Sequence, residues 1–136
     1  MSDTIKKVER FSVDVPDQAG EGARVLNALA AGKADLLAAW GYPLGGGNAK
    51  IELVPKDAVK MKAAAKAAKI KVKRESAAFC VVDRNKVGAL AAALATLAEK
   101  GVNIRAVQAL AVGGKYGALI EVDSKDARKA AKALGV

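Results

Sequence analysis

The sequence has no histidine, a single cysteine and few aromatic side chains, and each shortage excludes a class of function. Without histidine the chain cannot build a Ser-His-Asp or Cys-His nucleophile pair, an imidazole metal site or the commonest general base. Cys80 has no second cysteine with which to form an intrachain disulfide or a thiolate metal cluster. We therefore expect a protein that is not an enzyme and that holds neither a metal ion nor an organic cofactor.

Long apolar runs are also missing. None approaches the roughly 20 residues that a membrane-spanning helix needs, and the first ten residues, MSDTIKKVER, lack the apolar core of a signal peptide. We therefore expect a cytoplasmic protein that makes no use of a membrane. Its 136 residues suit one domain or two very small ones, and 52% apolar with 27% charged residues are typical of a folded globular chain.

The chain is basic, with a formal net charge of +9, which raises the question of nucleic-acid binding. The densest run of positive charge lies between residues 56 and 75, where Lys62, Lys66, Lys69 and Lys73 follow a helical spacing. A solvated outer helix face explains this spacing, and a surface that contacts phosphate groups is the alternative.

Alternating apolar and polar residues predict strands, and apolar residues at helical spacing predict the helices between them. For the first half we expect a strand at 7–16, a helix ending near Gly32, a hairpin of 35–42 with 50–54, a helix at 56–69 and a short strand at 70–74. For the second half we expect a strand at 77–82, a helix at 86–100, a hairpin of 102–112 with 116–122 and a helix at 125–134.

The two halves form an internal repeat. At an offset of 68 residues, matching apolar and glycine positions run from Phe11 and Phe79 to Ala30 and Ala98. Gly45-Gly46 meets Gly113-Gly114 at the same offset, and beyond the hairpin IELVPKDA matches IEVDSKDA at an offset of 69, which one inserted hairpin residue explains.

The repeat predicts an α+β protein of two ferredoxin-like (βαββαβ) units, residues 1–75 and 76–136, each with an antiparallel sheet and both helices on one face. The second unit is expected to lack its last strand. Each unit is marginal alone, so we expect the two to pack together and the chain to form a homodimer. The unmatched sheet edge of the second unit is an expected place of association.

Each repeat has a glycine-bearing turn between its first strand and its first helix, DQAG at residues 17–20 and NKVG at residues 85–88. The first turn of a helix leaves several backbone N–H groups unpaired and partly positive, and a glycine there admits a carboxylate close to the backbone. Asn85 and Asn103 bracket the second helix and offer both donor and acceptor atoms. We expect the fold to bring the start of this helix beside the start of the next strand.

The residues of these turns also have an alternative interpretation, in which they only stabilise the fold and bind no ligand. Asn85 and Asp17 are also suitable helix N-caps, Gly88 also permits close packing of the helix on the sheet, and Asn103 also suits the turn after Gly101.

The second repeat contains NKVGAL at residues 85–90, and GVNI begins thirteen residues after its glycine, at residue 101. These runs resemble the signature of ACT domains, small ferredoxin-like modules that bind amino acids and regulate metabolic enzymes. Their spacing is similar to that of the serine-binding ACT domain of bacterial phosphoglycerate dehydrogenase. The proline of the signature is absent from both repeats.

The resemblance implies a set of ligand residues. Asparagines at the places of Asn85 and Asn103 hold the amino acid in that domain, and a histidine stands where this chain has Asp83. The implied site of the second repeat consists of Asn85, Gly88 and Asn103, with Asp83, Val87 and Val102 beside them. The first repeat offers a more degenerate set, Asp17, Gly20 and Asp35. The aspartates are suited to hold an ammonium group.

The function that these observations favour is a non-catalytic regulatory module that binds an amino acid or a similar small zwitterion and acts through a dimer or partner-enzyme interface. One alternative is the regulatory subunit of a separate amino-acid biosynthetic enzyme. Another is a basic RNA-binding protein, because RNA-recognition motifs share this strand order. Nucleic acid is disfavoured, since such domains stack bases on strand aromatics and aromatic residues make up only 4% of this chain.

Overall fold

The structure is a computed structural model, and it describes residues 4–136. The elements follow in the order β1 (Ile5–Val8), β2 (Phe11–Pro16), α1 (Glu21–Ala31), β3 (Leu36–Gly45), β4 (Asn48–Pro55), α2 (Ala58–Ala67), β5 (Lys73–Arg74), β6 (Ala78–Arg84), α3 (Ala89–Glu99), β7 (Ile104–Val112), β8 (Lys115–Val122), the short 3-10 helix η2 (Ser124–Asp126) and α4 (Ala127–Leu134).

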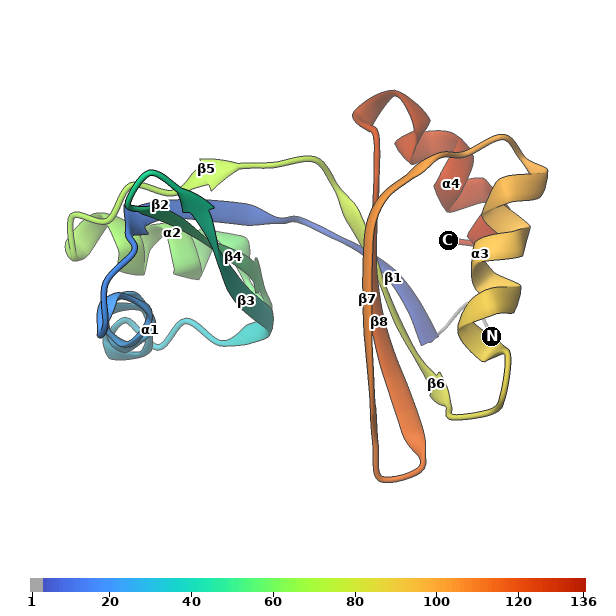
Figure 1. The fold of residues 1–136 in the computed structure, drawn as a ribbon, viewed down its shortest axis with the longest axis horizontal. Helices are drawn as coiled ribbons and strands as arrows, with labels where there is room; N and C mark the ends of the chain where they lie inside the picture. The colour runs from blue at the N-terminus through green and yellow to red at the C-terminus, as the bar shows by residue number, and fades with distance from the viewer. Residues whose placement is uncertain (1–3) are drawn as a thin grey trace. The chain divides into compact units, whose positions relative to one another are not determined.

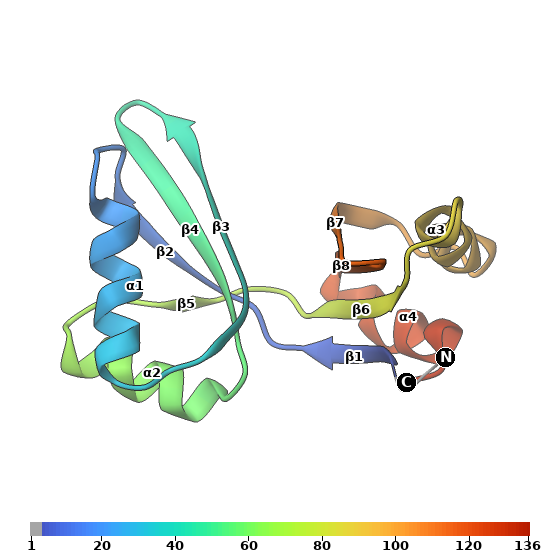
Figure 2. The ribbon, with the colours of Figure 1, turned by 90° about the horizontal axis from the view of Figure 1, so that it is seen from below.

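The chain divides into two α+β units, each with one four-stranded antiparallel sheet (Figure 1). The N-terminal unit, Glu9–Glu75, has the strand order β3-β4-β2-β5. The C-terminal unit consists of Ser76–Val136 together with β1 and has the order β1-β6-β8-β7. In each unit both helices lie on the same face of the sheet (Figure 2). The predicted fold class, two ferredoxin-like α+β units with antiparallel sheets and helices on one face, is confirmed.

The strand β1 changes the predicted division of the chain. The alternating pattern at residues 7–16 predicts one strand, but the structure breaks it at Glu9 and Arg10. β1 then pairs antiparallel with β6, with Ile5 opposite Val81 and Val8 opposite Ala78. No strand follows α4, and β1 takes the place of the missing last strand in the sheet. The expectation of an unmatched edge at β6 is therefore wrong.

The hairpins also align differently from the sequence prediction. Gly45 pairs with Asn48 and Val112 pairs with Lys115, so the turn glycines Gly46 and Gly47 correspond to Gly113 and Gly114. β3 contains one more bulge than β7, and the extra residues of the second repeat lie between β8 and α4, where η2 forms. The prediction of a single residue inserted in the second hairpin is therefore wrong.

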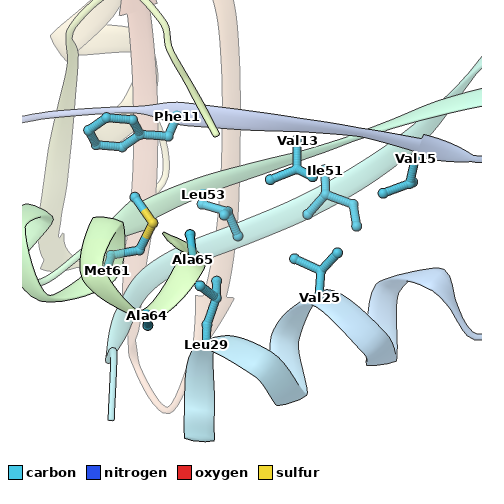
Figure 3. Close-up of a cluster of buried hydrophobic side chains, with 10 residues drawn as sticks. All are labelled: Phe11, Val13, Val15, Val25, Leu29, Ile51, Leu53, Met61, Ala64 and Ala65. Carbon is cyan, nitrogen blue, oxygen red and sulfur yellow. The ribbon is translucent and has the colours of Figure 1, made fainter. Parts of the chain in front are cut away.

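The core of the N-terminal unit lies between its sheet and its helices (Figure 3). It consists of Phe11, Val13, Val15, Val25, Leu29, Ile51, Leu53, Met61, Ala64 and Ala65. Val25 and Leu29 are one helical turn apart, so both point at the sheet. The two helices approach closely because Gly32 has no side chain: a Cβ there would lie 2.3 Å from the Cβ of Ala64.

The C-terminal unit has its own core, which consists of Phe79, Val81, Leu97, Val102, Tyr116, Ala118, Ile120, Val122, Ala130 and Leu134. Phe79 and Leu97 occupy the places that Phe11 and Leu29 take in the other unit. The alanine-rich helix α3 buries only Leu97 fully. Leu90 and Leu94 are partly buried and pack against this core, and alanine occupies position 93, where the N-terminal unit has Val25.

A buried ion pair lies on the N-terminal sheet. The Arg10 guanidinium donates to the Glu52 carboxylate, and the Tyr42 hydroxyl donates to the other oxygen of the same carboxylate. The side chains of Arg10 and Glu52 are 8% and 7% exposed. A buried charge is stable only with a partner of opposite charge, because burial removes most of the water that would otherwise solvate it.

Substitution Glu52→Leu therefore removes the carboxylate that two side chains contact. We expect the free energy of unfolding to fall by about 3 kcal/mol, because a buried cation loses its counterion. Urea denaturation followed by circular dichroism measures this. The control is Glu21→Leu, whose carboxylate pairs with the exposed Arg24 in the first turn of α1 and whose loss should cost at most about 1 kcal/mol. Equal midpoints for both variants would contradict the account.

A chain that starts at Glu9 lacks β1. We expect the stability of the C-terminal unit to fall by about 2–4 kcal/mol, because the ladder to β6 supplies several backbone hydrogen bonds, and we expect the bared β6 edge to associate. Hydrogen exchange of the β6 amides and light scattering measure the two effects. Trp40 of β3 is the single tryptophan and reports on the other unit. An unchanged β6 exchange rate would show that β1 is dispensable.

Candidate functional site

The turns that precede α1 and α3 have the same backbone geometry. Gly20 and Gly88 are the N-cap residues, with φ of 91° and 83° in the left-handed region that glycine adopts without strain. Neither helix has a side-chain cap, so the interpretation of Asp17 and Asn85 as N-caps is wrong. A Cβ at Gly88 would meet nothing within 4 Å, so close packing does not explain this glycine either.

Each turn is tied to the hairpin of its own unit. The Asp17 amide donates to the Gly47 carbonyl over 2.9 Å, and the Asn85 amide donates to the Gly114 carbonyl over 3.0 Å. These bonds hold the residues before each glycine in place by backbone atoms alone. The side chain of Asn85 is exposed and unengaged in the described part of the chain.

Two backbone donors remain open at the start of α3. The Ala89 amide donates to the Lys86 carbonyl, and the Ala92 amide donates to the Gly88 carbonyl. Between them, the amides of Leu90 and Ala91 have no protein acceptor among the described residues. They carry the partial positive charge of the helix N-terminus and suit an anionic group.

A cleft of about 420 Å³ lies beside this turn. We call it the turn cleft; it is lined by Asn85, Lys86, Gly88, Ala89, Leu90, Ala91, Ala109, Leu110, Ala111 and Tyr116. The first turn of α3 and Lys86 form its positive side, and β7 forms an apolar wall opposite. No acidic side chain is among its lining residues.

The structure separates the two asparagines that the sequence places together. Asn85 follows β6 at the hairpin end of the sheet, where Arg84 pairs with Lys115. Asn103 precedes β7 at the other end, where Ile104 pairs with Val122. The reason is that α3 runs back along the sheet, and its 11 residues rise by about 16 Å. The expectation that the start of the helix lies beside the start of the next strand is wrong.

The other implied residues of the second repeat lie in different environments. Val87 is fully exposed on the turn. Val102 is buried in the core, and its amide donates to the Leu97 carbonyl over 3.1 Å. Asp83 is half-buried at the end of β6 and does not line the turn cleft. One of its carboxylate oxygens accepts from the Arg84 amide over 2.7 Å.

The first-repeat residues follow the same pattern. Asp17 and Gly20 form the exposed turn before α1. Asp35 precedes β3 at the far end of the sheet, where its carboxylate accepts from the Leu36 amide over 3.0 Å. The Asp35 carbonyl accepts from the Lys56 amide over 3.0 Å. Asp35 is therefore occupied in ordering the entry into β3, and it is as remote from Gly20 as Asn103 is from Gly88.

Tyr116 lines the turn cleft and was not among the site residues expected from the sequence. It is 7% exposed and packs beneath the start of α3 on the helix-facing side of β8. Its hydroxyl has no hydrogen-bond partner in the described chain. Burial raises the pKa of this hydroxyl, and the nearby Asp83 carboxylate raises it further. The alternation Tyr116, Ala118, Ile120 was the signal that places it on the helix side.

Residues 4–136 contain no group of three His, Cys, Asp or Glu side chains placed to hold a metal ion. Within the same range, no helix is long and apolar enough to cross a membrane.

No family model matches the chain, and no curated protein sequence is significantly similar to it. Solved structures are similar. Protein BT0572 from Bacteroides thetaiotaomicron has a TM-score of 0.81 at 20% identity, over 97% of this chain and 89% of that one. The ligand-free regulatory subunit of aspartate kinase from Thermus thermophilus has a TM-score of 0.64 at 20% identity, over 96% and 94%.

The regulatory subunit of aspartate kinase from Thermus flavus has a TM-score of 0.63 at 17% identity, over 97% of this chain and 95% of that one. The chain has the fold of these regulatory subunits. It also spans nearly their whole length, so both repeats take part in the likeness.

Substitution of Gly88 tests whether its positive φ requires glycine. We expect Gly88→Ala to lower the free energy of unfolding by about 1 kcal/mol, because an L side chain is strained at positive φ. The control, Gly22→Ala, lies inside α1 with open space around it, and it should raise stability by about 0.5–1 kcal/mol through helix propensity. Urea denaturation of both variants measures the difference, and shifts of the same sign would contradict this assignment.

Proposed function

We propose that this protein is a non-catalytic regulatory module that binds an amino acid in the turn cleft. The observation that carries the proposal is the pair of open amides at Leu90 and Ala91, which lie beside a glycine in a cleft with Asn85 and Lys86. The likeness in fold to regulatory subunits of aspartate kinase supports a regulatory role.

The cleft suits the carboxylate end of an amino acid best. The carboxylate would accept from the two open amides, and Lys86 would add a positive charge at the same end. Asn85 would contact the polar atoms of the ligand, and Leu110 with the alanines of β7 would face its side chain. The resemblance of NKVGAL to a serine-binding ACT domain favours a small amino acid.

The ammonium group needs an acceptor that the turn cleft does not supply. Asn103 suits this role by chemistry, but within one unit it lies at the other end of the sheet. A homodimer with antiparallel neighbouring sheets would bring the Asn103 of one copy to the turn cleft of the other. We therefore propose a homodimer in which each site uses both copies.

The edge strand β7 supports this arrangement. It lies at the edge of its sheet, and almost all of its residues are exposed, among them Leu110 (72%) and Val112 (69%). A long, apolar and unpaired edge is a template for pairing with another strand. Its residues also form the wall of the turn cleft, so pairing at β7 would place a second copy beside the ligand.

The regulatory subunit of a separate biosynthetic enzyme is the form of this function that the comparisons favour, because the similar Thermus chains are described as such subunits and are covered almost completely.

The turn at Asp17 and Gly20 repeats the geometry of the second turn, and we propose it as a second, weaker site. RNA binding loses support, because Tyr116 packs under α3 and is not available on the open face of the sheet.

The test is a thermal-shift and calorimetric screen of the full chain against the twenty amino acids at millimolar concentration. We expect stabilisation by at least one small amino acid, and loss of binding in both Asn85→Ala and Asn103→Ala. The control Asn27→Ala changes an exposed asparagine of α1 and should bind normally. If none of the twenty stabilises the protein, the proposed function is wrong.

Mixing the two variants tests the shared site separately. Randomly re-formed dimers of Asn85→Ala with Asn103→Ala should recover about a quarter of the sites, because each mixed dimer contains one intact site and one doubly altered site. Calorimetric stoichiometry measures this recovery. No recovery on mixing, or full affinity in Asn103→Ala alone, would show that the site is not built from two copies.

A further inference from the structure

The C-terminal unit contains a second cleft, of about 290 Å³, between α3 and α4 above the sheet. We call it the interhelix cleft; it is lined by Thr4, Ile5, Val81, Asp83, Lys86, Ala89, Ala92, Ala93, Thr96, Tyr116, Ala133 and Leu134. The turn cleft reaches β7, whereas the interhelix cleft reaches α4 and β1 at the opposite edge of the sheet. The proposed amino-acid site does not account for it.

The N-terminal unit fills the equivalent space with side chains. Val25 of α1 stands where α3 has Ala93, and Met61 of α2 stands where α4 has Ala130. Both are fully buried, and Figure 3 shows them between the helices and the sheet. Tight packing is the ordinary state of a core, so the smaller residues of the C-terminal unit leave room that the fold itself does not require.

The helices of the two units also differ at the point of closest approach. Gly32 lets α1 meet α2 at Ala64, where a Cβ would be only 2.3 Å from the Ala64 Cβ. The residue equivalent to Gly32 is Lys100, at the C-cap of α3. Its side chain excludes the same close contact with Ala133, so α3 and α4 cannot close the cleft in this way.

Polar atoms enter the cleft at its floor. The buried Val15 of the N-terminal unit is replaced by the half-buried Asp83, which pairs across the strands with Tyr116. The Tyr116 hydroxyl has no partner among the described residues, and only one Asp83 oxygen is engaged, by the Arg84 amide. Neither side chain has a polar atom cut off from solvent, and both have hydrogen-bonding capacity that the described residues leave open to a ligand.

We propose that the interhelix cleft is a second binding site, which takes a small aliphatic amine. Its ammonium group binds the Asp83 carboxylate and the Tyr116 hydroxyl, and its alkyl chain packs against Val81, Ala92 and Ala93. Asp83 is the acidic side chain among the lining residues, and its carboxylate gives an ammonium group a charged partner. Lys86 also lines the cleft, but no ion pair joins it to Asp83 among the described residues. The volume of the cleft equals that of about ten water molecules, so an amine of four carbons, with its five non-hydrogen atoms, is small enough to enter.

The probes are n-butylamine, n-butanol and butyrate, titrated into the full chain and followed by the amide and methyl resonances of α3. Butylamine should shift the signals of Ala92, Ala93 and Thr96 to saturation, and butanol and butyrate should bind at least tenfold more weakly, because a charged hydrogen bond is lost. The signals of Ala93 and Thr96 decide the comparison, because these residues line the interhelix cleft and not the turn cleft. Equal or tighter binding of butyrate at these two residues, or no saturable shift with butylamine, overturns the proposal.

Two variants locate the site. Asp83→Asn keeps the shape of the side chain and should weaken butylamine binding about tenfold or more. Ala93→Val restores the residue of the N-terminal unit and should abolish binding while raising the melting temperature, because it fills the cleft. Its matched control, Ala95→Val, is on the exposed side of α3 and should bind as the parent does. Undiminished binding by Ala93→Val overturns the proposal even if Asp83→Asn fails to fold.

Discussion

The four residue pairs between β1 and β6 are the interaction on which the C-terminal unit depends. β6 lies in the interior of its sheet only because β1 covers its outer edge, and β6 leads directly into the turn at Asn85 and Gly88. A frayed β6 would release both the turn and the start of α3. The geometry of the turn cleft therefore rests on a pairing between residues about 75 positions apart in the chain.

The turns before α1 and α3 have the same backbone conformation and the same backbone hydrogen bond to the hairpin. A left-handed glycine at the N-cap directs the chain into the helix, and a bond to the hairpin carbonyl holds the preceding residue. No side chain is required for either bond, so the side chains of Asn85, Lys86 and Val87 are free to differ from those of Asp17, Gln18 and Ala19. This separation of backbone and side-chain tasks lets the two turns carry different side chains on the same backbone geometry.

Much of this architecture could be predicted from the sequence, because alternation and helical spacing report directly on which face of an element is buried. The internal repeat then supplied the order of elements twice. The break was missed although the two consecutive polar residues Glu9 and Arg10 interrupt the alternation between Val8 and Phe11. Such an interruption does not say which sheet each half joins, because only the tertiary pairing decides that.

Part of the geometry of the candidate site could be predicted from the sequence. The glycine turn follows from local backbone chemistry, and the structure places Asn85 and Gly88 in one cleft. Asn103 was misplaced because a motif gives spacing along the chain, whereas a crossover helix reverses direction in space. The interhelix cleft has no local signature at all. It results from differences in side-chain volume between equivalent positions of the two repeats, such as Val25 and Ala93. Whether a smaller side chain leaves a cleft depends on which residues pack opposite it.

The position of β1 at the start of the chain makes the C-terminal unit a circular permutation of the N-terminal one: its outer strand is made first instead of last. During synthesis, residues 9–75 emerge as a contiguous unit that can fold at once, while β1 must wait for β6. The N-terminal unit is thus an insertion within the other. The chain passes between the units at two places, after β1 and after β5. A single proteolytic cut at either connection would leave both sheets with all four of their strands, because β1 and β5 stay paired with their neighbours.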